Sequence, residues 1–448
     1  MIETNLTQAA ASNGKSQADF SSTYSRNFIS TLLAQVGMLG LNVLSGVASA
    51  RLLGPRGRGE LAALTLWPSV LIFLGSLGIN QSIVFYTGRR RYDASEICTA
   101  MTVTGLLQSL CVILVGLIAV PLALRGYSPG VVHLGLVFLL FAPALMLGGY
   151  PANLLQGKLD LLSFNFIRVI PSLTYALGLG GLFLFKRPSL KNVVGVQILG
   201  VVLAFLGGYA LLFAKQPVHF AITGQAFKDL LSYGWKSQLS NVTYYVNQRL
   251  DQLLLSIFVA PRDLGLYAVA VTVSTALSFF PEASAMVTLA TGSNVGPARA
   301  RIVIANSFRS SLVWLLLGCS ALFVLVPWLI PFAFGANFKG SVLACRILLP
   351  GAVVMGLSRV LYDGARSLNE PALPSYSEGL GVVLTCLGLY VLLPRLGFLG
   401  AAVASTLAYT TSLIFTLVLY RVRLRFALHE LLRGSTGRLP VTGTAAGT

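Results

Sequence analysis

Charged residues are scarce in this chain of 448 amino acids. Asp and Glu together number 14, and all charged residues make up only 10% of the sequence. A soluble globular protein carries about 25% charged residues, so this chain has too few to cover a surface that faces water. Hydrophobic residues make up 55%, and the mean hydropathy is +0.78. The scarcity of charge excludes an ordinary soluble domain and indicates that lipid surrounds most of the chain.

Residue types that catalyse reactions or bind metals are also scarce. The three histidines are scattered over expected loops and interfaces, and the five cysteines form no C-x-x-C pair. Cysteines in apolar runs are usually free, buried thiols, so neither a zinc site nor a disulfide framework is expected. The sequence also contains no Walker A, Gly-x-Ser-x-Gly or H-E-x-x-H motif. We therefore expect a protein that is not an enzyme and that needs no metal and no cofactor.

Long apolar runs account for most of the chain. A run of about 20 apolar residues crosses a bilayer as a helix, whereas barrel strands would read as short alternating segments. The runs here are long and continuous, so they predict helices. Twelve spans are expected, near residues 28–50, 61–86, 97–121, 131–153, 162–185, 192–214, 229–258, 264–290, 303–334, 341–366, 372–394 and 397–420.

The net charge of +18 fits membrane topology better than it fits nucleic-acid binding, because no soluble basic domain is present. A basic cavity for an anionic substrate is the alternative reading. Lys and Arg are more frequent in the loops on the side of the N-terminus, which predicts cytoplasmic N- and C-termini. The first residues lack the apolar core of a signal peptide, so the first span is expected to be retained. The expected division is a polar tail at 1–27, an N-lobe at 28–214, a linker at 215–228, a C-lobe at 229–420 and a basic tail at 421–448.

A short motif occurs twice, each time between two apolar runs. Residues 55–62 read PRGRGELA and residues 261–268 read PRDLGLYA, so Pro, Arg, Gly and Ala recur after 206 residues (261 − 55). Internal repeats of membrane bundles are typical of transporters, whose substrate site lies near the interface between the halves. The repeat therefore predicts two related halves and a transport function.

The seventh expected span, residues 229–258, is the most polar. A charged residue inside a membrane is costly, so it is a candidate for function. Helical spacing places several polar side chains on one stripe, which would face water or the interior of the bundle. Lys236 either reaches the headgroups or lines such a cavity, and Arg168 in the fifth span has the same two alternatives. The candidate substrate-binding residues are Lys236, Arg249, Arg168, Tyr244, Tyr245, Asn241 and Gln248.

A second set of charges is a candidate for ion coupling or gating. Glu282 follows Pro281 near the middle of the eighth span, where snorkelling cannot explain a carboxyl group. Asp363 has arginines at spacings of four and three, which allows either an ion-pair gate or a local cluster at the helix end. Glu378 lies near one end of its span and is assigned to the membrane interface. The candidate ion-coupling or gating residues are Glu282, Asp251, Asp363, Arg359 and Arg366.

Two motifs resemble those of a known membrane family. Residues 50–60 read ARLLGPRGRGE after the first span, and residues 249–255 read RLDQLLL ahead of GLYAVA at 265–270. Together they resemble the polysaccharide transporter branch of the multidrug/oligosaccharidyl-lipid/polysaccharide flippase superfamily, and the likeness extends over almost the whole chain. The resemblance implies an all-α integral membrane protein of about 12 transmembrane helices, in two pseudo-symmetric six-helix lobes around a central cavity.

The resemblance also implies a function and partners. Such flippases move an undecaprenyl-diphosphate-linked oligosaccharide from the inner to the outer leaflet of the bacterial cytoplasmic membrane by alternating access, beside glycosyltransferases and a polysaccharide polymerase. A diphosphate requires Lys or Arg, and a glycan suits the Tyr, Asn and Gln of the seventh span. Lipid II flippases usually carry an Arg-Asp pair where this chain has Ser45 and Gly46, which argues against the peptidoglycan precursor. The alternative is a cation-coupled multidrug or small-molecule antiporter of the same superfamily, with Glu282 at the ion site.

Overall fold

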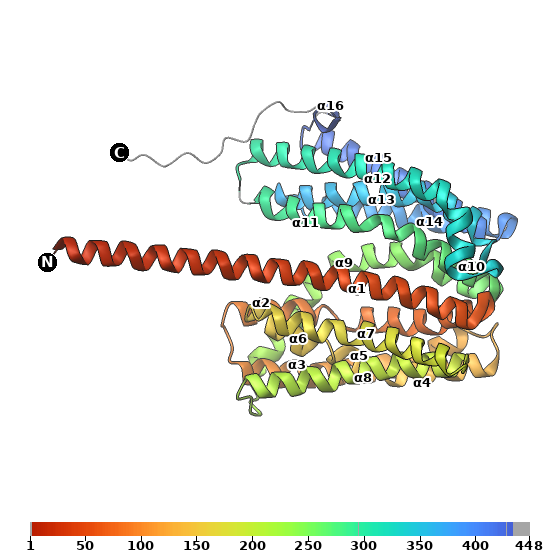
Figure 1. The fold of residues 1–448 in the computed structure, drawn as a ribbon, viewed down its shortest axis with the longest axis horizontal. Coiled ribbons are helices and arrows are strands. Elements are labelled where there is room, and N and C mark those ends of the chain that lie inside the picture. The colour runs from red at the N-terminus through yellow and green to blue at the C-terminus, as the bar shows by residue number, and fades with distance from the viewer. Residues whose placement is uncertain (1, 294, 427, 433–448) are drawn as a thin grey trace. The chain divides into compact units, whose positions relative to one another are not determined.

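The computed structural model describes residues 2–293, 295–426 and 428–432, without the side chains of 2–29, 32, 239–241, 244, 290 and 428. Within these ranges all regular secondary structure is helical and no strand occurs (Figure 1). The longer helices are α1 (Ile2–Gly75), α3 (Ala94–Ala123), α7 (Leu161–Leu184), α8 (Leu190–Lys215), α9 (Gly224–Phe258), α12 (Pro297–Phe334), α13 (Ser341–Ser367), α14 (Leu373–Leu396) and α15 (Phe398–Val422). The shorter ones are α2 (Ile79–Gly88), α4 (Pro129–Leu140), α5 (Ala142–Leu147), α6 (Tyr150–Gly157), α10 (Pro261–Ser274), α11 (Phe279–Ser293) and α16 (Leu428–Leu432), with 3₁₀ turns at Thr275–Ser278 and Ala336–Phe338.

The chain divides into two compact units, which we describe separately. Unit 1 comprises Met1–Val242, Gln252–Ala268 and Ala333–Asn337, and unit 2 comprises Thr243–Asp251, Val269–Phe332 and Phe338–Thr448. The helices α9 and α10 thus contribute residues to both units. The predicted lobe boundaries, with a linker at 215–228, remain a prediction.

The described helices account for the expected spans. Nine helices in the described ranges are long and apolar enough to cross a membrane, or ten if the bent pair Pro129–Leu140 and Ala142–Gly157 is one span. One of the nine, Leu33–Gly75, contains a backbone break and covers most of the first expected span and most of the second. The helix α9 has the length of a span, with 35 residues, but its polar side chains exclude it from that count. The chain is therefore an all-α, multi-pass membrane protein.

The break in α1 lies at the first copy of the repeated motif. Gly54 has φ 67° and ψ −178°, which is a conformation that glycine adopts without steric cost. Pro55 follows directly, and its fixed φ and missing N–H suit the first position of a new helical segment. The sequence predicted a connection at 51–60 between the first two spans, and the structure joins two helical segments at Gly54, within that range.

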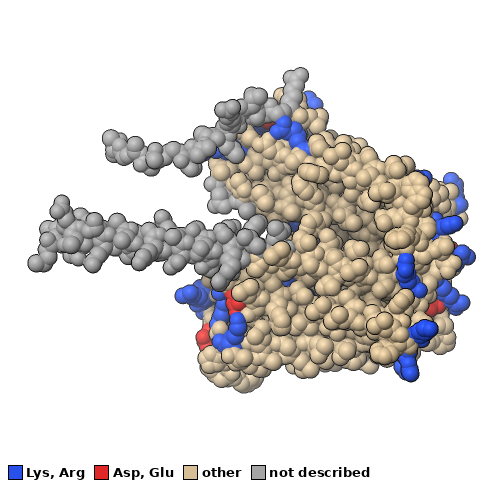
Figure 2. Space-filling model, in the orientation of Figure 1, with Lys and Arg blue, Asp and Glu red and all other residues tan. Residues whose placement is uncertain are grey.

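Unit 1 packs around one apolar core, while its outer surface is also apolar. The helix α7 packs against both α1 and α8 (Figure 1). On α3, large apolar side chains recur at helical spacing along one exposed side of the helix. On the surface drawn in Figure 2, the described Lys and Arg lie near helix ends. An exposed apolar face on such a helix is the surface that contacts lipid. The exposed residues of this face of α3 are Leu107, Leu110, Leu114 and Ile118, and the core includes Ile79, Ile83, Met101, Leu147, Tyr150 and Leu154.

Unit 2 is built around α13, the most buried of its candidate spans. The helix α15 packs against both α13 and α14, and α11 packs against α13. Within the span window of α13, 61% of the residues are buried, compared with 17% for α12. The core of this unit includes Ile304, Phe308, Leu357, Leu361, Tyr420 and Phe426. The helix α13 is therefore the central element around which polar side chains of unit 2 can be shielded from lipid.

Candidate functional site

The residues of α9 that belong to unit 2 direct polar side chains into its interior. Asn247 and Asp251 are one helical turn apart and only 4% exposed each. The next helices in that interior, α14 and α15, supply small residues at the contact. Gly381 makes room for Asn247, since a Cβ there would lie 3.0 Å from Asn247 Nδ2 and 2.6 Å from Ser412 Oγ. The polar stripe predicted for the seventh span thus includes residues that face protein rather than lipid.

Glu378 on α14 is the carboxyl group at the centre of this interior. Its side chain is 6% exposed, and Asn247 Nδ2 donates a hydrogen bond of 2.5 Å to Glu378 Oε2. The other amide atom, Asn247 Oδ1, accepts no hydrogen bond from the described residues, and neither does the buried hydroxyl of Thr385. Buried oxygens without donors are costly, so a proton or a small cation beside Asn247 Oδ1 would be stabilised.

Two small cavities flank Gln248 and extend from Asp251 to Glu378. The one beside Asp251 has a volume of about 50 Å³, and the one beside Glu378 a volume of about 10 Å³. Gln248, Met355 and Tyr409 line both cavities. A cavity needs about 10–15 Å³ to hold one water molecule, so these spaces fit single small species and are far too small for a sugar.

The arrangement supplies the ligands that hard cations prefer. Carboxylate, amide carbonyl and hydroxyl oxygens bind such ions, and Glu378, Asn247 and Ser358 present these three oxygen types at the smaller cavity. At the other end, Ser405 Oγ donates a hydrogen bond of 3.3 Å to Asp251 Oδ2. The same oxygens could hold a proton on a carboxyl group. No group of three or more His, Cys, Asp or Glu arranged for a metal ion occurs in the described part of the chain.

An ion-pair cluster lies on α13 close to the same core. Asp363 is 2% exposed, and Arg366 Nη1 lies 2.8 Å from its Oδ1. On the other side, Arg359 Nη2 lies 3.6 Å from Asp363 Oδ2. The spacing of four and three residues thus brings both arginines onto one buried carboxylate, and their own side chains remain partly exposed. Whether this cluster acts as a gate stays a prediction.

The structure places the other predicted candidates outside this interior. Lys236 and Arg249 are exposed on α9, and Glu282 is exposed on α11. Arg168 is half-buried, with its guanidinium 4.8 Å from the centre of the Phe164 ring on its own helix. Tyr245 is half-buried, whereas the side chains of Asn241 and Tyr244 lie outside the described residues. The roles predicted for these residues remain predictions.

Glu378, which the sequence indicated to lie at the membrane interface, is buried inside unit 2. The carboxyl group is near the start of α14, but α15 covers it, because small residues such as Ser412 allow close approach. A signal was present in the sequence: a single carboxyl group in an apolar span, followed by Gly379 and Gly381. Such residues inside spans face protein and mark functional sites.

The sequence of this chain matches a known protein family. Residues 24–289 match the family described as Polysaccharide biosynthesis protein. The probable low-salt glycan biosynthesis flippase Agl15 of Haloferax volcanii is 20% identical over 87% of this chain and 82% of its own length.

Two solved structures share the fold. The lipid II flippase MurJ in an inward closed conformation has a TM-score of 0.74 at 15% identity, covering 89% of this chain and 88% of its own. An inward-facing multidrug resistance MATE family transporter of the MOP superfamily has a TM-score of 0.73 at 15% identity, covering 86% and 94%. At these identities the likeness concerns the fold alone. Because the family match extends over more than half of the sequence, this chain belongs to the polysaccharide biosynthesis protein family, with the fold of MOP superfamily transporters.

Proposed function

We propose that this protein is a secondary flippase for a lipid-linked oligosaccharide in surface polysaccharide synthesis. It moves an undecaprenyl-diphosphate-linked unit from the inner to the outer leaflet of the cytoplasmic membrane by alternating access. It transports the unit without transforming it and is therefore not an enzyme. The observation that carries the proposal is the family match over residues 24–289. The related flippase of Haloferax volcanii supports it, because its name also specifies glycan biosynthesis.

The topology and partners belong to the same proposal. The N- and C-termini face the cytoplasm, as the distribution of Lys and Arg predicts. Glycosyltransferases that build the unit and a polymerase that consumes it act beside the flippase. The candidate headgroup contacts are the exposed or half-buried polar residues of α9 and α7, namely Lys236, Arg249, Tyr245, Gln248 and Arg168.

Coupling to a cation gradient is the energetic part of the proposal. The cluster of Glu378, Asn247 and Ser358 fits a proton or one small cation, and its cavity excludes anything larger. A carboxyl group that is buried in one conformation and wetted in another binds and releases a cation once per cycle. This site replaces Glu282 as the first residue to test for coupling, because Glu282 is exposed.

The second candidate function is cation-coupled export of small molecules. It is favoured by the same cation-sized cluster and by the shared fold with a multidrug transporter. Both candidate functions need this cluster, so the cluster does not distinguish them. They differ in the substrate that is transported.

The test uses the full-length protein in proteoliposomes. A fluorescent undecaprenyl-diphosphate oligosaccharide is placed in one leaflet, and its appearance in the other leaflet is followed with an impermeant quencher. The proposal expects transfer that depends on the protein and accelerates under a sodium or proton gradient. If the lipid-linked sugar stays in place while a gradient drives accumulation of a cationic dye, the antiporter is correct and the flippase is not.

A further inference from the structure

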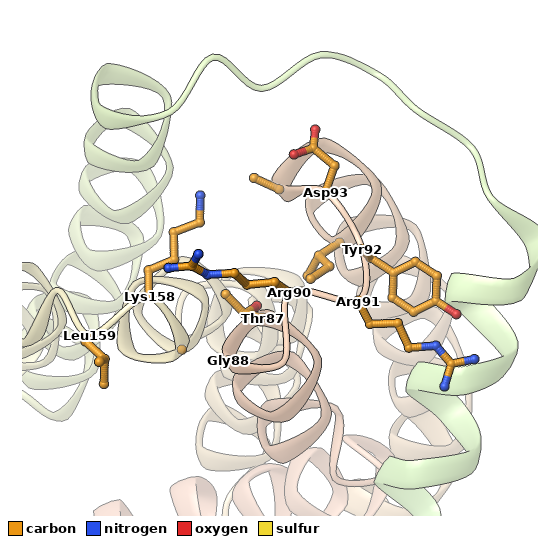
Figure 3. Close-up of a pocket in the computed structure, with 11 residues that line it drawn as sticks. Thr87, Gly88, Arg90, Arg91, Tyr92, Asp93, Lys158 and Leu159 are labelled. Carbon is orange, nitrogen blue, oxygen red and sulfur yellow. The ribbon is translucent and has the colours of Figure 1, made fainter.

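Unit 1 contains a cavity of about 650 Å³ at one end, which shares no lining residue with the site described above. It lies between the loop that joins α2 to α3 and the loop that joins α6 to α7 (Figure 3). Arg90, Arg91 and Asp93 come from the first loop, and Lys158 and Leu159 from the second. This end of the unit is the one that the charge distribution predicts to face the cytoplasm.

The ends of α2 and α6 have the same backbone geometry. Arg90 N–H donates to Thr87 O at 3.1 Å, Arg91 N–H donates to Tyr86 O at 3.3 Å, and the same pair of bonds closes α6 at Leu159. This motif places one residue in the left-handed conformation, which usually belongs to glycine. Here it belongs to Arg90, with φ 51°, and to Leu159, with φ 62°. The two loops thus hold their side chains at the cavity by a shared helix-ending motif.

Asp229 on α9 binds two side chains of the first loop. Arg91 Nη2 lies 2.9 Å from Asp229 Oδ2, and Tyr92 OH donates to the same oxygen at 2.7 Å. Figure 3 shows both side chains directed toward α9, away from Lys158. The negative charge of Asp229 is therefore used by Arg91 and does not compensate Arg90.

Two positive charges remain at the cavity. In Figure 3 the Arg90 guanidinium points toward Lys158, while the Asp93 carboxylate points away from both. Lys158 Nζ donates to the neutral Gln216 Oε1 at 2.5 Å, so its charge is solvated but not balanced. No ion pair of Arg90 or Lys158 occurs in the described part of the chain, so neither positive charge is bonded to a carboxylate.

We propose that this cavity binds a phosphate-bearing anion, drawn either from an anionic lipid headgroup or from a soluble phosphate compound. A phosphate would relieve the repulsion between Arg90 and Lys158, and Arg can donate two parallel hydrogen bonds to it. Asp93 and Glu96 already cap the N-terminus of α3, so Arg90 and Lys158 would hold the phosphate. The inference is independent of the proposed function, because it concerns neither the α9 residues nor Glu378.

The experiment measures binding to the full-length protein in neutral detergent. One arm titrates inorganic pyrophosphate, and the other titrates dioleoylphosphatidylglycerol, with dioleoylphosphatidylcholine as the lipid reference. Affinity is read from the ligand-dependent rise in the unfolding temperature and from native mass spectrometry of lipid adducts. We expect saturable binding in at least one arm and no comparable binding of the phosphatidylcholine.

The test variant is Arg90→Asn with Lys158→Gln. Asn tolerates the left-handed conformation, so the first substitution removes a charge without adding backbone strain. The matched control is Lys186→Asn with Arg125→Gln, because Lys186 has φ 51° and both residues lie beyond the opposite ends of α7 and α3. We expect the affinity of the test variant to fall at least tenfold while the control binds like the wild type.

The outcomes distinguish a lipid headgroup from a soluble phosphate compound, and they also show whether the proposed site is wrong. Binding in the lipid arm alone identifies a bilayer headgroup, and binding of pyrophosphate alone identifies a soluble phosphate compound. The inference is overturned if the wild type binds neither, if the test variant binds as tightly, or if the control loses affinity equally. Should the double variant fail to fold, Lys158→Gln alone serves, with a threefold or greater loss expected and an unchanged affinity counting against the site.

Discussion

Gly59 and Gly265 bring two helix backbones into direct contact within unit 1. A Cβ on Gly59 would lie 1.7 Å from the carbonyl oxygen of Pro261, and a Cβ on Gly265 would lie 1.9 Å from that of Pro55. Each glycine is thus pressed against the proline that opens the other copy of the repeated motif. The two copies of the motif, which recur after 206 residues and indicated related halves, therefore also contact each other.

We therefore expect Gly59→Ala to destabilise the protein severely. Overpacking a tight core costs about 1–3 kcal/mol, and here the added methyl meets a carbonyl group that cannot rotate away. Gly265→Ala should have the same effect for the reciprocal reason. The unfolding temperature of purified protein and the yield of monodisperse protein after membrane extraction measure it.

The matched control for these substitutions is Gly180→Ala. A Cβ at Gly180 meets nothing within 4 Å, and alanine favours a helix over glycine by about 1 kcal/mol. This variant should be as stable as the wild type or slightly more so. If it loses as much stability as Gly59→Ala, close contact at the repeat is not the cause.

Glu378→Gln should remove the response to a cation gradient while the protein still folds. The amide retains the size of the side chain and a hydrogen-bonding oxygen toward Asn247, but it can bind neither a proton nor a cation by charge. Transport in proteoliposomes with and without sodium and proton gradients measures the effect. Glu282→Gln is the comparison, because it removes the same charge from an exposed position, and it should leave the gradient response intact.

The ion cluster on α13 should show strong coupling between its members. Asp363→Asn leaves Arg359 and Arg366 without their buried counter-charge, and breaking a buried pair costs about 3–5 kcal/mol. Because both arginines are partly exposed, we expect the lower part of this range or less. A double-mutant cycle with Arg366→Gln measures the coupling in unfolding experiments. Additive effects would show that the 2.8 Å contact contributes nothing.

Asp160, which precedes α7, pairs with Lys215 at the end of α8, and this pair predicts a pH dependence. Partial burial raises the pKa of Asp160, but hydrogen bonds from Lys215 and Ser163, with the charge of Lys215, outweigh it and leave the pKa below its usual value. The ion pair therefore stabilises the protein above the unfolded pKa of about 3.9, and this is lost as the pH falls through the folded pKa.

The size of this effect is limited by exposure. Both partners are partly exposed, and exposed pairs contribute about 0.2–1 kcal/mol. Asp160→Asn should lower the unfolding temperature slightly at pH 7, and the difference from the wild type should shrink below pH 4. A difference that stays constant across this range would mean that the charge of Asp160 does not matter.

Much of the fold could be predicted because its causes are local in sequence. Apolar runs of span length predict membrane helices, and every expected span coincides with described helical segments. The site residues were harder to predict, because the burial of a side chain depends on helices that are far away in the sequence. Glu378 reads as interfacial by its place in α14, and α15 with Ser412 buries it. Glu282 was expected near the middle of its span as a coupling site, and its side chain lies on the exposed face of α11.

The small volume of the cavity beside Glu378 has a consequence for ion selectivity. A space of about 10 Å³ admits an ion only after that ion has lost nearly all of its hydration water. The oxygens of Asn247, Ser358 and Glu378 must then replace the lost water ligands. Discrimination at such a site depends on the difference between dehydration cost and coordination energy, so ions of equal charge but different radius should compete unequally for it.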